Sequence, residues 1–393
     1  MKNKIKLLSF MIASLGLAAC QANYPPSSDS AASEVTSSTQ SVQDSTAKID
    51  QTFKVEKVGT FQEPWALSSL PDGQLLITER KGQLKLFNPT NQQTRNVKGV
   101  PEVAYGGQGG LGDIVVHPDF AQNHWVYLSY AEKGQGGTGA VVIRAELDLT
   151  QATPTLKNIK RIWEQVPKVK GEGHYSHRIA FDEQGVLWIS SGERQQFTPA
   201  QDMKSNLGKV LRLSAEGQPL VDNPFYAQGG VTAQIWSLGH RNPLGLAFDA
   251  KKQLWVVEMG PKGGDELNLV KKGANYGYPE VSNGDHYDDK PIPDHVTRPE
   301  FEAPKIHWTP VISPSSLMFY QGDQFPLWKN KALISGLSSK AIVIVDVDAQ
   351  PVQEVQRLDM GKRIRAVQQA QDGGIWVLED EAGANLLKLS PTS

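Results

Sequence analysis

The stretch Pro243–Glu258, PLGLAFDAKKQLWVVE, decides the fold of this chain. Large apolar residues alternate with small ones up to Phe248, a pattern typical of a strand with one buried face. Residues 249–252 (DAKK) are polar and predict a turn, and residues 254–258 (LWVVE) predict a returning apolar strand. Two strands joined by a short polar turn indicate an antiparallel β-hairpin.

Five further segments repeat this hairpin pattern at intervals of about 50 to 70 residues. They are Pro64–Thr78, Leu111–Ser129, Arg178–Ser190, Ser316–Ser335 and Ile364–Glu379. Six copies of one hairpin at this spacing suit four-stranded sheets repeated around an axis, which leaves few sheet edges exposed. We therefore expect an all-β fold over residues 51–393, a six-bladed β-propeller of four-stranded antiparallel blades. A pair of β-sandwiches is the structural alternative.

The first 20 residues have the character of an export signal. Three lysines precede an apolar run at residues 7–19, which is too short to span a membrane comfortably as a helix. The run ends in LAAC at residues 17–20, which resembles the lipobox of bacterial lipoproteins. Cys20 is the only cysteine and cannot form an internal disulfide, which favours lipid attachment over an ordinary signal peptide with a chance cysteine. We expect a lipoprotein signal peptide over residues 1–20.

Residues 21–50 are rich in Ser, Thr, Gln and Ala and have almost no large apolar side chains. Such a segment cannot bury enough surface to offset its ordering entropy, so a disordered tether is predicted. Gln21, rather than Asp, follows the cysteine, and the lipoprotein resemblance then implies the outer membrane of a Gram-negative bacterium. We therefore expect a periplasmic protein that meets the membrane only through its lipid anchor.

The charge of the chain is balanced. The formal net charge is −2, from 40 basic and 42 acidic residues. A balanced chain lacks the basic excess typical of nucleic-acid-binding proteins, so no such partner is expected.

Hard oxygen donors follow the second strand of the central hairpin. Gly260 has no side chain and Pro261 has no N–H, so the carbonyl groups there are open to a ligand. Glu266 and the carbonyl groups around Tyr276 add to a donor set that calcium prefers. A long turn whose acids are simply solvated is the alternative.

Two other loops carry groups suited to catalysis or binding. His174 and His177 precede a predicted strand, and a histidine suits general-base work because its charge changes near neutral pH. In an extended segment, residues three apart point to opposite sides, so only one of them could face a shared site. Arg363 and Arg365 are two apart and would point to the same side, as a carboxylate clamp requires. A polar loop and a solvated basic edge are the respective alternatives.

Three motifs occur in order: HRNPLGLAF at 240–248, EMGPKGGDELN at 258–268 and GANYGYP at 273–279. Together they closely resemble the soluble glucose and aldose sugar dehydrogenases that use pyrroloquinoline quinone (PQQ). Matches in further loops extend the resemblance over residues 55–390. The resemblance implies a six-bladed propeller with PQQ over its shaft and calcium on the quinone.

The resemblance also implies roles for individual residues. It implies that His174 is the catalytic base and that Arg241 contacts quinone and substrate and stabilises the developing oxyanion. The implied cofactor-binding residues are Gln108, Asn242, Trp308, Lys340, Arg363, Arg365 and Asp380. The implied metal-binding residues are Gly260, Pro261, Glu266 and Tyr276.

Three positions depart from the family pattern. His177 stands where the family usually has glycine, and Gly173 replaces an acid of glucose-specific members, which puts glucose specificity in doubt. Ser338 stands where the family has a cofactor-binding lysine, and Lys340 lies two residues further on. Either Lys340 reaches the same carboxylate or the contact is missing.

The implied function is the PQQ- and calcium-dependent oxidation of aldose sugars at C1 to aldonolactones, by hydride transfer to the quinone. Electrons would pass to a quinone or cytochrome acceptor of the respiratory chain, and the protein would be a monomer or homodimer. Two alternatives stay open: a calcium-dependent sugar lactonase, and a non-catalytic propeller lipoprotein that binds sugar or cell wall.

Overall fold

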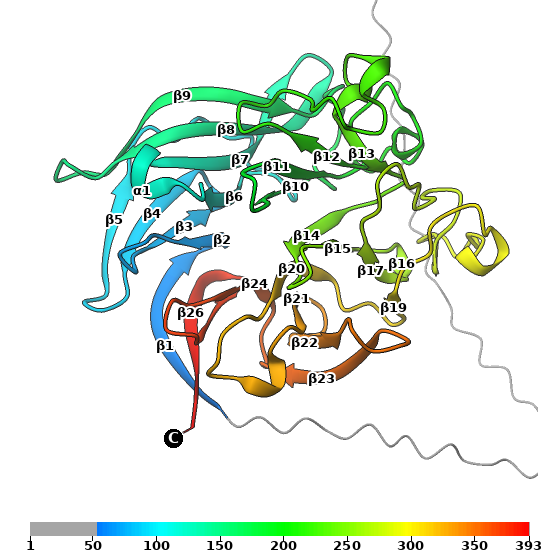
Figure 1. Cartoon of the computed structure of the whole chain (residues 1–393). Coiled ribbons are helices and arrows are strands. Elements are labelled where there is room, and N and C mark those ends of the chain that lie inside the picture. The colour runs from blue at the N-terminus through cyan, green and yellow to red at the C-terminus, as the bar shows by residue number, and fades with distance from the viewer. Residues whose placement is uncertain (1–52, 393) are drawn as a thin grey trace, which may run out of the picture. The chain divides into compact units, whose positions relative to one another are not determined.

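Each of the six predicted hairpins forms the first two strands of a four-stranded antiparallel sheet in the computed structural model, which describes residues 53–392 (Figure 1). Each sheet is one blade, and the blades are arranged around a common centre (Figure 1). The first strands of neighbouring blades contact one another all the way around the ring. The predicted six-bladed β-propeller is therefore confirmed, and the alternative of paired β-sandwiches is wrong.

The first three blades follow one another along the chain. Blade 1 consists of β2 (Pro64–Ser69), β3 (Leu75–Glu79), β4 (Gln83–Asn88) and β5 (Gln93–Val97). Blade 2 consists of β6 (Leu111–Val116), β7 (Trp125–Gly134), β8 (Gly137–Asp148) and β9 (Thr155–Glu164). Blade 3 consists of β10 (Ser176–Phe181), β11 (Leu187–Ser191), β12 (Lys209–Leu213) and β13 (Ile235–Leu238).

The other three blades complete the ring. Blade 4 consists of β14 (Pro243–Phe248), β15 (Leu254–Glu258), β17 (Asp265–Leu269) and β19 (Ile306–Trp308). Blade 5 consists of β20 (Pro314–Phe319), β21 (Ala332–Gly336), β22 (Ala341–Asp346) and β23 (Gln353–Asp359). Blade 6 consists of β24 (Ile364–Gln369), β25 (Ile375–Glu379), β26 (Ala382–Pro391) and β1 (Phe53–Gln62).

The ring is closed by strands from the two ends of the described chain. β1 pairs antiparallel with β26, from Phe53 opposite Pro391 to Gln62 opposite Ala382. Blade 6 is thus built from both ends, which covers the strand edge that β26 would otherwise expose.

An acidic turn residue fixes the hairpins of blades 3 and 4 in the same way. The carboxylate of Asp249 accepts hydrogen bonds from the backbone N–H groups of Lys251 and Gln253, at 2.8 and 2.9 Å, and from the indole of Trp255 at 2.9 Å. Asp182 and Trp188 repeat the arrangement, with the indole N–H 3.1 Å from the carboxylate. The same spacing of aspartate and tryptophan therefore produces the same turn twice.

Blade 4 carries the largest excursion from the regular pattern. Between its strands, β16 (Lys262–Gly263) pairs with β18 (Gly284–Asp285) to form a small additional sheet. The helical turns of the described chain are short: α1 (Phe120–Asn123), η1 (Thr198–Ala200), η2 (Tyr226–Gln228), η3 (Thr232–Gln234), η4 (His295–Thr297) and η5 (Pro326–Trp328).

Within residues 53–392, no helix is long and apolar enough to cross a membrane. The predicted signal peptide, the lipidation site Cys20 and the tether over residues 21–50 lie outside the described residues.

Candidate active site

A pocket of about 330 Å³, called the mouth pocket below, opens where the first strands of the blades begin. Four of its lining residues come directly after the second strand of a hairpin: Arg80, Met259, Leu337 and Asp380. The repeat thus places the same position of several blades around one cavity. Its volume is at the lower end of the range for small-molecule and cofactor sites.

Three guanidinium groups line this pocket, those of Arg80, Arg363 and Arg365. The carboxylate of Asp380 lies between two of them, accepting hydrogen bonds from Arg363 Nε at 2.8 Å and Arg365 Nη2 at 2.6 Å. Burial alone would raise the pKa of Asp380, but the neighbouring Arg365 and Arg363 outweigh it and hold the pKa below its usual value. One carboxylate against three guanidinium groups leaves the pocket positively charged, so it favours an anionic ligand.

Gln108 connects this pocket to the loop that carries the predicted base. Its side chain lines the pocket, and its Oε1 accepts a hydrogen bond from the backbone N–H of His174 at 2.8 Å. Its own N–H donates to the carbonyl oxygen of Glu172 at 2.7 Å. Gln108 lies in the glycine-rich stretch at residues 106–112. It therefore holds this stretch against the loop that carries His174, called the base loop below.

His174 is buried and pairs with Glu193, whose Oε1 lies 2.5 Å from the imidazole Nδ1. Burial lowers the pKa of His174, and the hydrogen bond to Glu193 opposes that effect only in part. A lowered pKa keeps the imidazole neutral at pH 7, as a general base requires. The carboxylate holds the proton on Nδ1, which leaves Nε2 as the basic nitrogen.

The segment from His174 to His177 is not extended, contrary to the prediction. His174, Ser176 and His177 have φ values of 48°, 57° and 54°, in the left-handed region that side chains other than glycine rarely adopt. The buried side chain of Arg194 holds this loop by donating to the carbonyl oxygens of Gly173 at 2.8 Å and Gly171 at 2.6 Å. His177 lies at the start of β10, where the pairing with β11 is irregular between Ser176 and Ile179, so regular strand alternation does not set the directions of the two histidines.

Arg241 and Asn242 come directly before β14 in the chain. Arg241 Nη1 donates to the carbonyl oxygens of Met259 at 2.9 Å and Gly260 at 2.6 Å, whereas its buried Nε has no partner in the described chain. Asn242 is fully buried, and its Oδ1 accepts a hydrogen bond from Ser176 Oγ at 2.9 Å. The carbonyl oxygen of Gly260, one of the predicted calcium ligands, is thus in contact with Arg241.

A cavity of about 10 Å³, the room that one water or ion needs, lies beside Arg241. Glu258, Glu266 and Tyr276 line it. Burial raises the pKa of Glu266 well above its ordinary value, and the nearby charge of Glu258 raises it further. The Oδ1 atom of Asn268, whose amide donates to both carboxylates, is buried without a hydrogen-bond partner in residues 53–392. The two carboxylates that line the cavity fit a hard cation.

Pro261, Trp308 and Lys340 lie outside the lining of the mouth pocket. Trp308 ends β19, the outer strand of blade 4, where it packs in the blade core and donates its indole N–H to Glu354 at 2.8 Å. It does not lie over the pocket as the resemblance implied, because the outer strand is remote from the centre of the ring. Lys340 is exposed.

The sequence pattern missed two residues of this site. Glu193 lies in an irregular loop after β11, where no periodicity marks it. Arg80 follows β3 as Asp380 follows β25, so superposing the hairpin repeats on one another would have found it.

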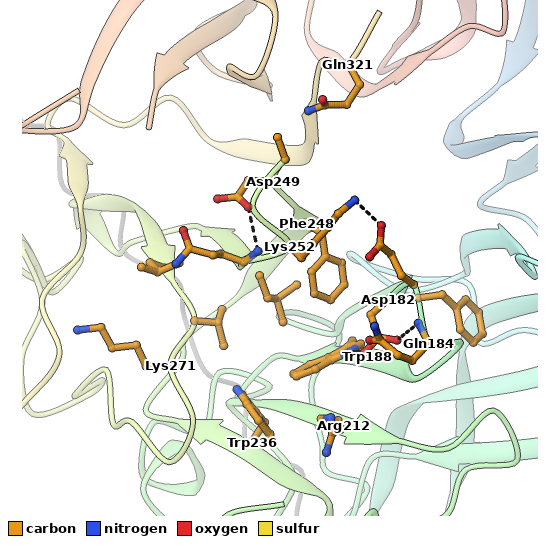
Figure 2. Close-up of a pocket in the computed structure, with 17 residues that line it drawn as sticks. Asp182, Gln184, Trp188, Arg212, Trp236, Phe248, Asp249, Lys252, Lys271 and Gln321 are labelled. Carbon is orange, nitrogen blue, oxygen red and sulfur yellow. Dashed lines mark hydrogen bonds and ion pairs between the residues drawn. The ribbon is translucent and has the colours of Figure 1, made fainter. Parts of the chain in front are cut away.

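A larger pocket, of about 720 Å³, lies elsewhere (Figure 2). The turns of the blade 3 and blade 4 hairpins line it, at the ends of β10 and β14 opposite to the mouth pocket. Trp188, Trp236 and Arg212 form part of its wall (Figure 2). The carboxylates of Asp182 and Asp249 face their own turns and are already hydrogen-bonded there. None of the predicted site residues lines this pocket.

Comparison with known proteins identifies relatives of this chain. The family model described as Glucose / Sorbosone dehydrogenase matches residues 61–388. Aldose sugar dehydrogenase YliI of Escherichia coli (strain K12) is 39% identical over 339 residues, which are 84% of this chain and 90% of that protein.

Two solved structures share the fold. The soluble aldose sugar dehydrogenase from Escherichia coli in the apo form superposes with a TM-score of 0.81 and 38% identity, over 87% of this chain and 100% of that one. The PQQ-bound form of aldose sugar dehydrogenase from Streptomyces coelicolor superposes with a TM-score of 0.72 and 26% identity, over 87% and 99% of the two chains. These matches confirm the predicted resemblance and the prediction of an oxidoreductase. The chain belongs to the Glucose / Sorbosone dehydrogenase family.

Proposed function

We propose that this protein oxidises aldose sugars at C1 to aldonolactones, with PQQ and calcium as cofactors. The observation that carries the proposal is the positively charged mouth pocket, whose lining residue Gln108 is hydrogen-bonded to His174, the partner of Glu193. PQQ carries three carboxylates, and the pocket presents three guanidinium groups. The relatives named aldose sugar dehydrogenase, one of them in a PQQ-bound form, support the same function.

The residues present fit the cofactor. Arg80, Arg363 and Arg365 would neutralise its carboxylates, since guanidinium groups suit planar, bidentate recognition. Gln108 lines the same pocket and Asn242 is buried beside the base loop. When bound, PQQ supplies a two-electron oxidant that accepts the hydride of the sugar carbon.

Calcium fits the small cavity beside Arg241. Glu266 and the carbonyl oxygen of Tyr276 would hold it, because these are hard oxygen donors. A calcium ion on the Gly260 and Pro261 carbonyls requires Arg241 to release its hydrogen bond to Gly260. At that position the ion would polarise a carbonyl group as a Lewis acid.

The chain's own residues then perform the proton chemistry. Nε2 of His174 removes the proton from the anomeric hydroxyl of the sugar, and Glu193 stabilises the imidazolium that forms. Arg241 places its guanidinium beside the base and stabilises the negative charge that develops during oxidation. The lowered pKa of His174 keeps it ready to accept a proton at pH 7.

The cellular setting is part of the proposal. A lipid on Cys20 would anchor the propeller to the periplasmic side of the outer membrane, and a quinone or cytochrome would accept the electrons.

The lactonase alternative needs carboxylates that converge on a metal in the shaft. Within residues 53–392, no group of three or more His, Cys, Asp and Glu side chains is placed to hold a metal ion.

Reconstitution tests the proposed function. Apoprotein should oxidise no aldose with an artificial electron acceptor, and addition of PQQ with Ca²⁺ should restore activity. EDTA should oppose the reconstitution. Activity without PQQ, or activity supported by NAD, would show that the proposal is wrong.

A further inference from the structure

His177 lines the mouth pocket but takes no part in the proposed proton transfer. Its imidazole is 2% exposed and stacks on the indole of Trp65, with ring centroids 5.1 Å apart and planes inclined by 14°. A Cβ atom at Gly112 would lie 1.9 Å from the Cε1 atom of this ring, so only glycine leaves room for it. The imidazole is therefore held in one position by close packing on two sides.

The hydrogen bonds of Ser129 decide which imidazole nitrogen carries the proton. Ser129 Oγ accepts a hydrogen bond from the backbone N–H of Asp113 at 2.8 Å and lies 2.7 Å from Nδ1 of His177. Ser129 is fully buried, and Nδ1 is the only acceptor that residues 53–392 offer its hydroxyl, so the hydroxyl proton points at Nδ1. Nδ1 then accepts, and Nε2 carries the proton of the neutral ring.

The Nε2–H group has no hydrogen-bond partner among residues 53–392, and it is not one of the buried polar atoms left unpaired there, so it keeps access to the pocket that His177 lines. A donor that faces a pocket takes its acceptor from the contents of that pocket, which are water or a ligand. The guanidinium groups of the same pocket cannot accept a hydrogen bond. The missing acceptor is thus expected to arrive with the ligand of the pocket.

We propose that His177 is a fixed neutral hydrogen-bond donor that contacts an acceptor oxygen of the bound PQQ. The inference rests on the proposed function, since it takes PQQ as the occupant of the pocket. His177 touches the cofactor and leaves the proton of the substrate to His174.

The electrostatic surroundings agree with a neutral ring. Burial, together with the charge of the adjacent Arg178, lowers the pKa of His177 to about 3. The ring therefore stays uncharged from pH 5 to pH 8, and its hydrogen bond to the cofactor should not vary over that range.

A set of substitutions separates the effect of the hydrogen-bond donor of His177 from the effect of its packing against Trp65. His177→Gln places an amide N–H near the position of Nε2, whereas His177→Asn has an amide only near the position of Nδ1. His177→Phe keeps a ring against Trp65 but has no donor. Absorbance titration of each apoprotein with PQQ and Ca²⁺ gives the dissociation constant. The asparagine and phenylalanine variants should bind roughly 10- to 100-fold more weakly than wild type, and the glutamine variant within about threefold.

A second measurement does not depend on mutations that might perturb the fold. Nitrogen-15 NMR of the wild-type imidazoles, assigned to His177 by loss of its signals in His177→Gln, should show a protonated Nε2 and an unprotonated Nδ1. The pattern should be the same at pH 5 and pH 8, and the Nε2 proton signal should shift when PQQ is added.

The outcomes distinguish this inference from the proposed function. If wild-type protein does not bind PQQ at all, the proposed function fails. If wild type binds PQQ but His177→Phe binds it equally well, or if Nδ1 carries the proton, the role of His177 is refuted while the proposed function stands.

Discussion

Removing the charge of Glu193 should slow turnover more than any other conservative change near the base. The Glu193 carboxylate lies 2.5 Å from Nδ1 of His174 and also accepts a hydrogen bond from the backbone N–H of Phe197 at 2.6 Å. Glu193→Gln has one oxygen for these two N–H groups, so one of them is left facing an amide donor. The substitution therefore removes the counter-charge of the imidazolium and one hydrogen bond together.

The expected size follows from the strength of that contact. A hydrogen bond to a charged group contributes about 1.5–3 kcal/mol. If the full amount is expressed only when His174 becomes protonated, kcat should fall roughly 10- to 100-fold, at tenfold per 1.36 kcal/mol. The hydrogen bond to Glu193 raises the pKa of His174 against the larger effect of burial. The glutamine variant should therefore have a lower pKa at His174, and the acid limb of its pH–rate profile should move to lower pH.

Steady-state kinetics with PQQ-loaded enzyme from pH 5 to pH 9 measures both effects. Cofactor occupancy by absorbance and the melting temperature show whether the fold and the pocket are intact. Glu183→Gln is a matched control, because Glu183 is 58% exposed and pairs with Lys252 on the far side of the blade. A Glu193→Gln enzyme with kcat within about threefold of wild type, or an acid limb that moves to higher pH, would refute the proposed pairing of base and carboxylate.

Three further predictions concern the cofactor, the metal and the anchor. Arg365→Met should weaken PQQ binding roughly 10- to 100-fold in absorbance titrations, whereas Arg357→Met on an outer strand should not, and equal effects would contradict the clamp. Calcium should raise the melting temperature more at pH 8 than at pH 5, because burial and Glu258 raise the pKa of Glu266, whose proton must leave before the ion binds. Without calcium, the free energy of unfolding should fall as pH rises through the pKa of Glu266, since the native state there holds a proton that the unfolded chain has lost. Glu266→Gln should abolish the pH dependence of the calcium effect and that of the stability without calcium. A calcium effect that does not vary with pH would contradict the proposed calcium site. Cys20→Ser should release the protein from the membrane fraction without changing the melting temperature, and a wild-type protein that carries no lipid by mass spectrometry would disprove the anchor.

The fold could be predicted because its repeating unit is short and local. Each hairpin shows alternating apolar residues and a polar turn within about 16 residues, as in Pro243–Glu258. The fourth strand of a blade is harder to predict. β19 follows β17 only after a long excursion, and β1 joins blade 6 from the other end of the chain. No local pattern specifies pairings over such distances.

The candidate site also contains residues whose positions could be predicted from the sequence and residues whose positions could not. Arg363 and Arg365 were predicted to point to one side, and both line the mouth pocket, where each contacts Asp380. The directions of His174 and His177 could not be predicted, because both residues have positive φ where the chain enters β10, whose pairing is irregular between Ser176 and Ile179. Glu193 was missed because only the folded loop brings it to the base.

Because β1 pairs with β26, the propeller needs both of these strands to be stable. Strands more than 300 residues apart form blade 6, from Phe53 opposite Pro391 onwards. A chain that stops before β26 leaves β1 without its only neighbouring strand, and blade 6 then keeps only β24 and β25. Unpaired strand edges and uncovered apolar faces favour aggregation and proteolysis. Prematurely terminated copies should therefore be removed as defective chains, and the intact enzyme should unfold as one cooperative unit and not blade by blade.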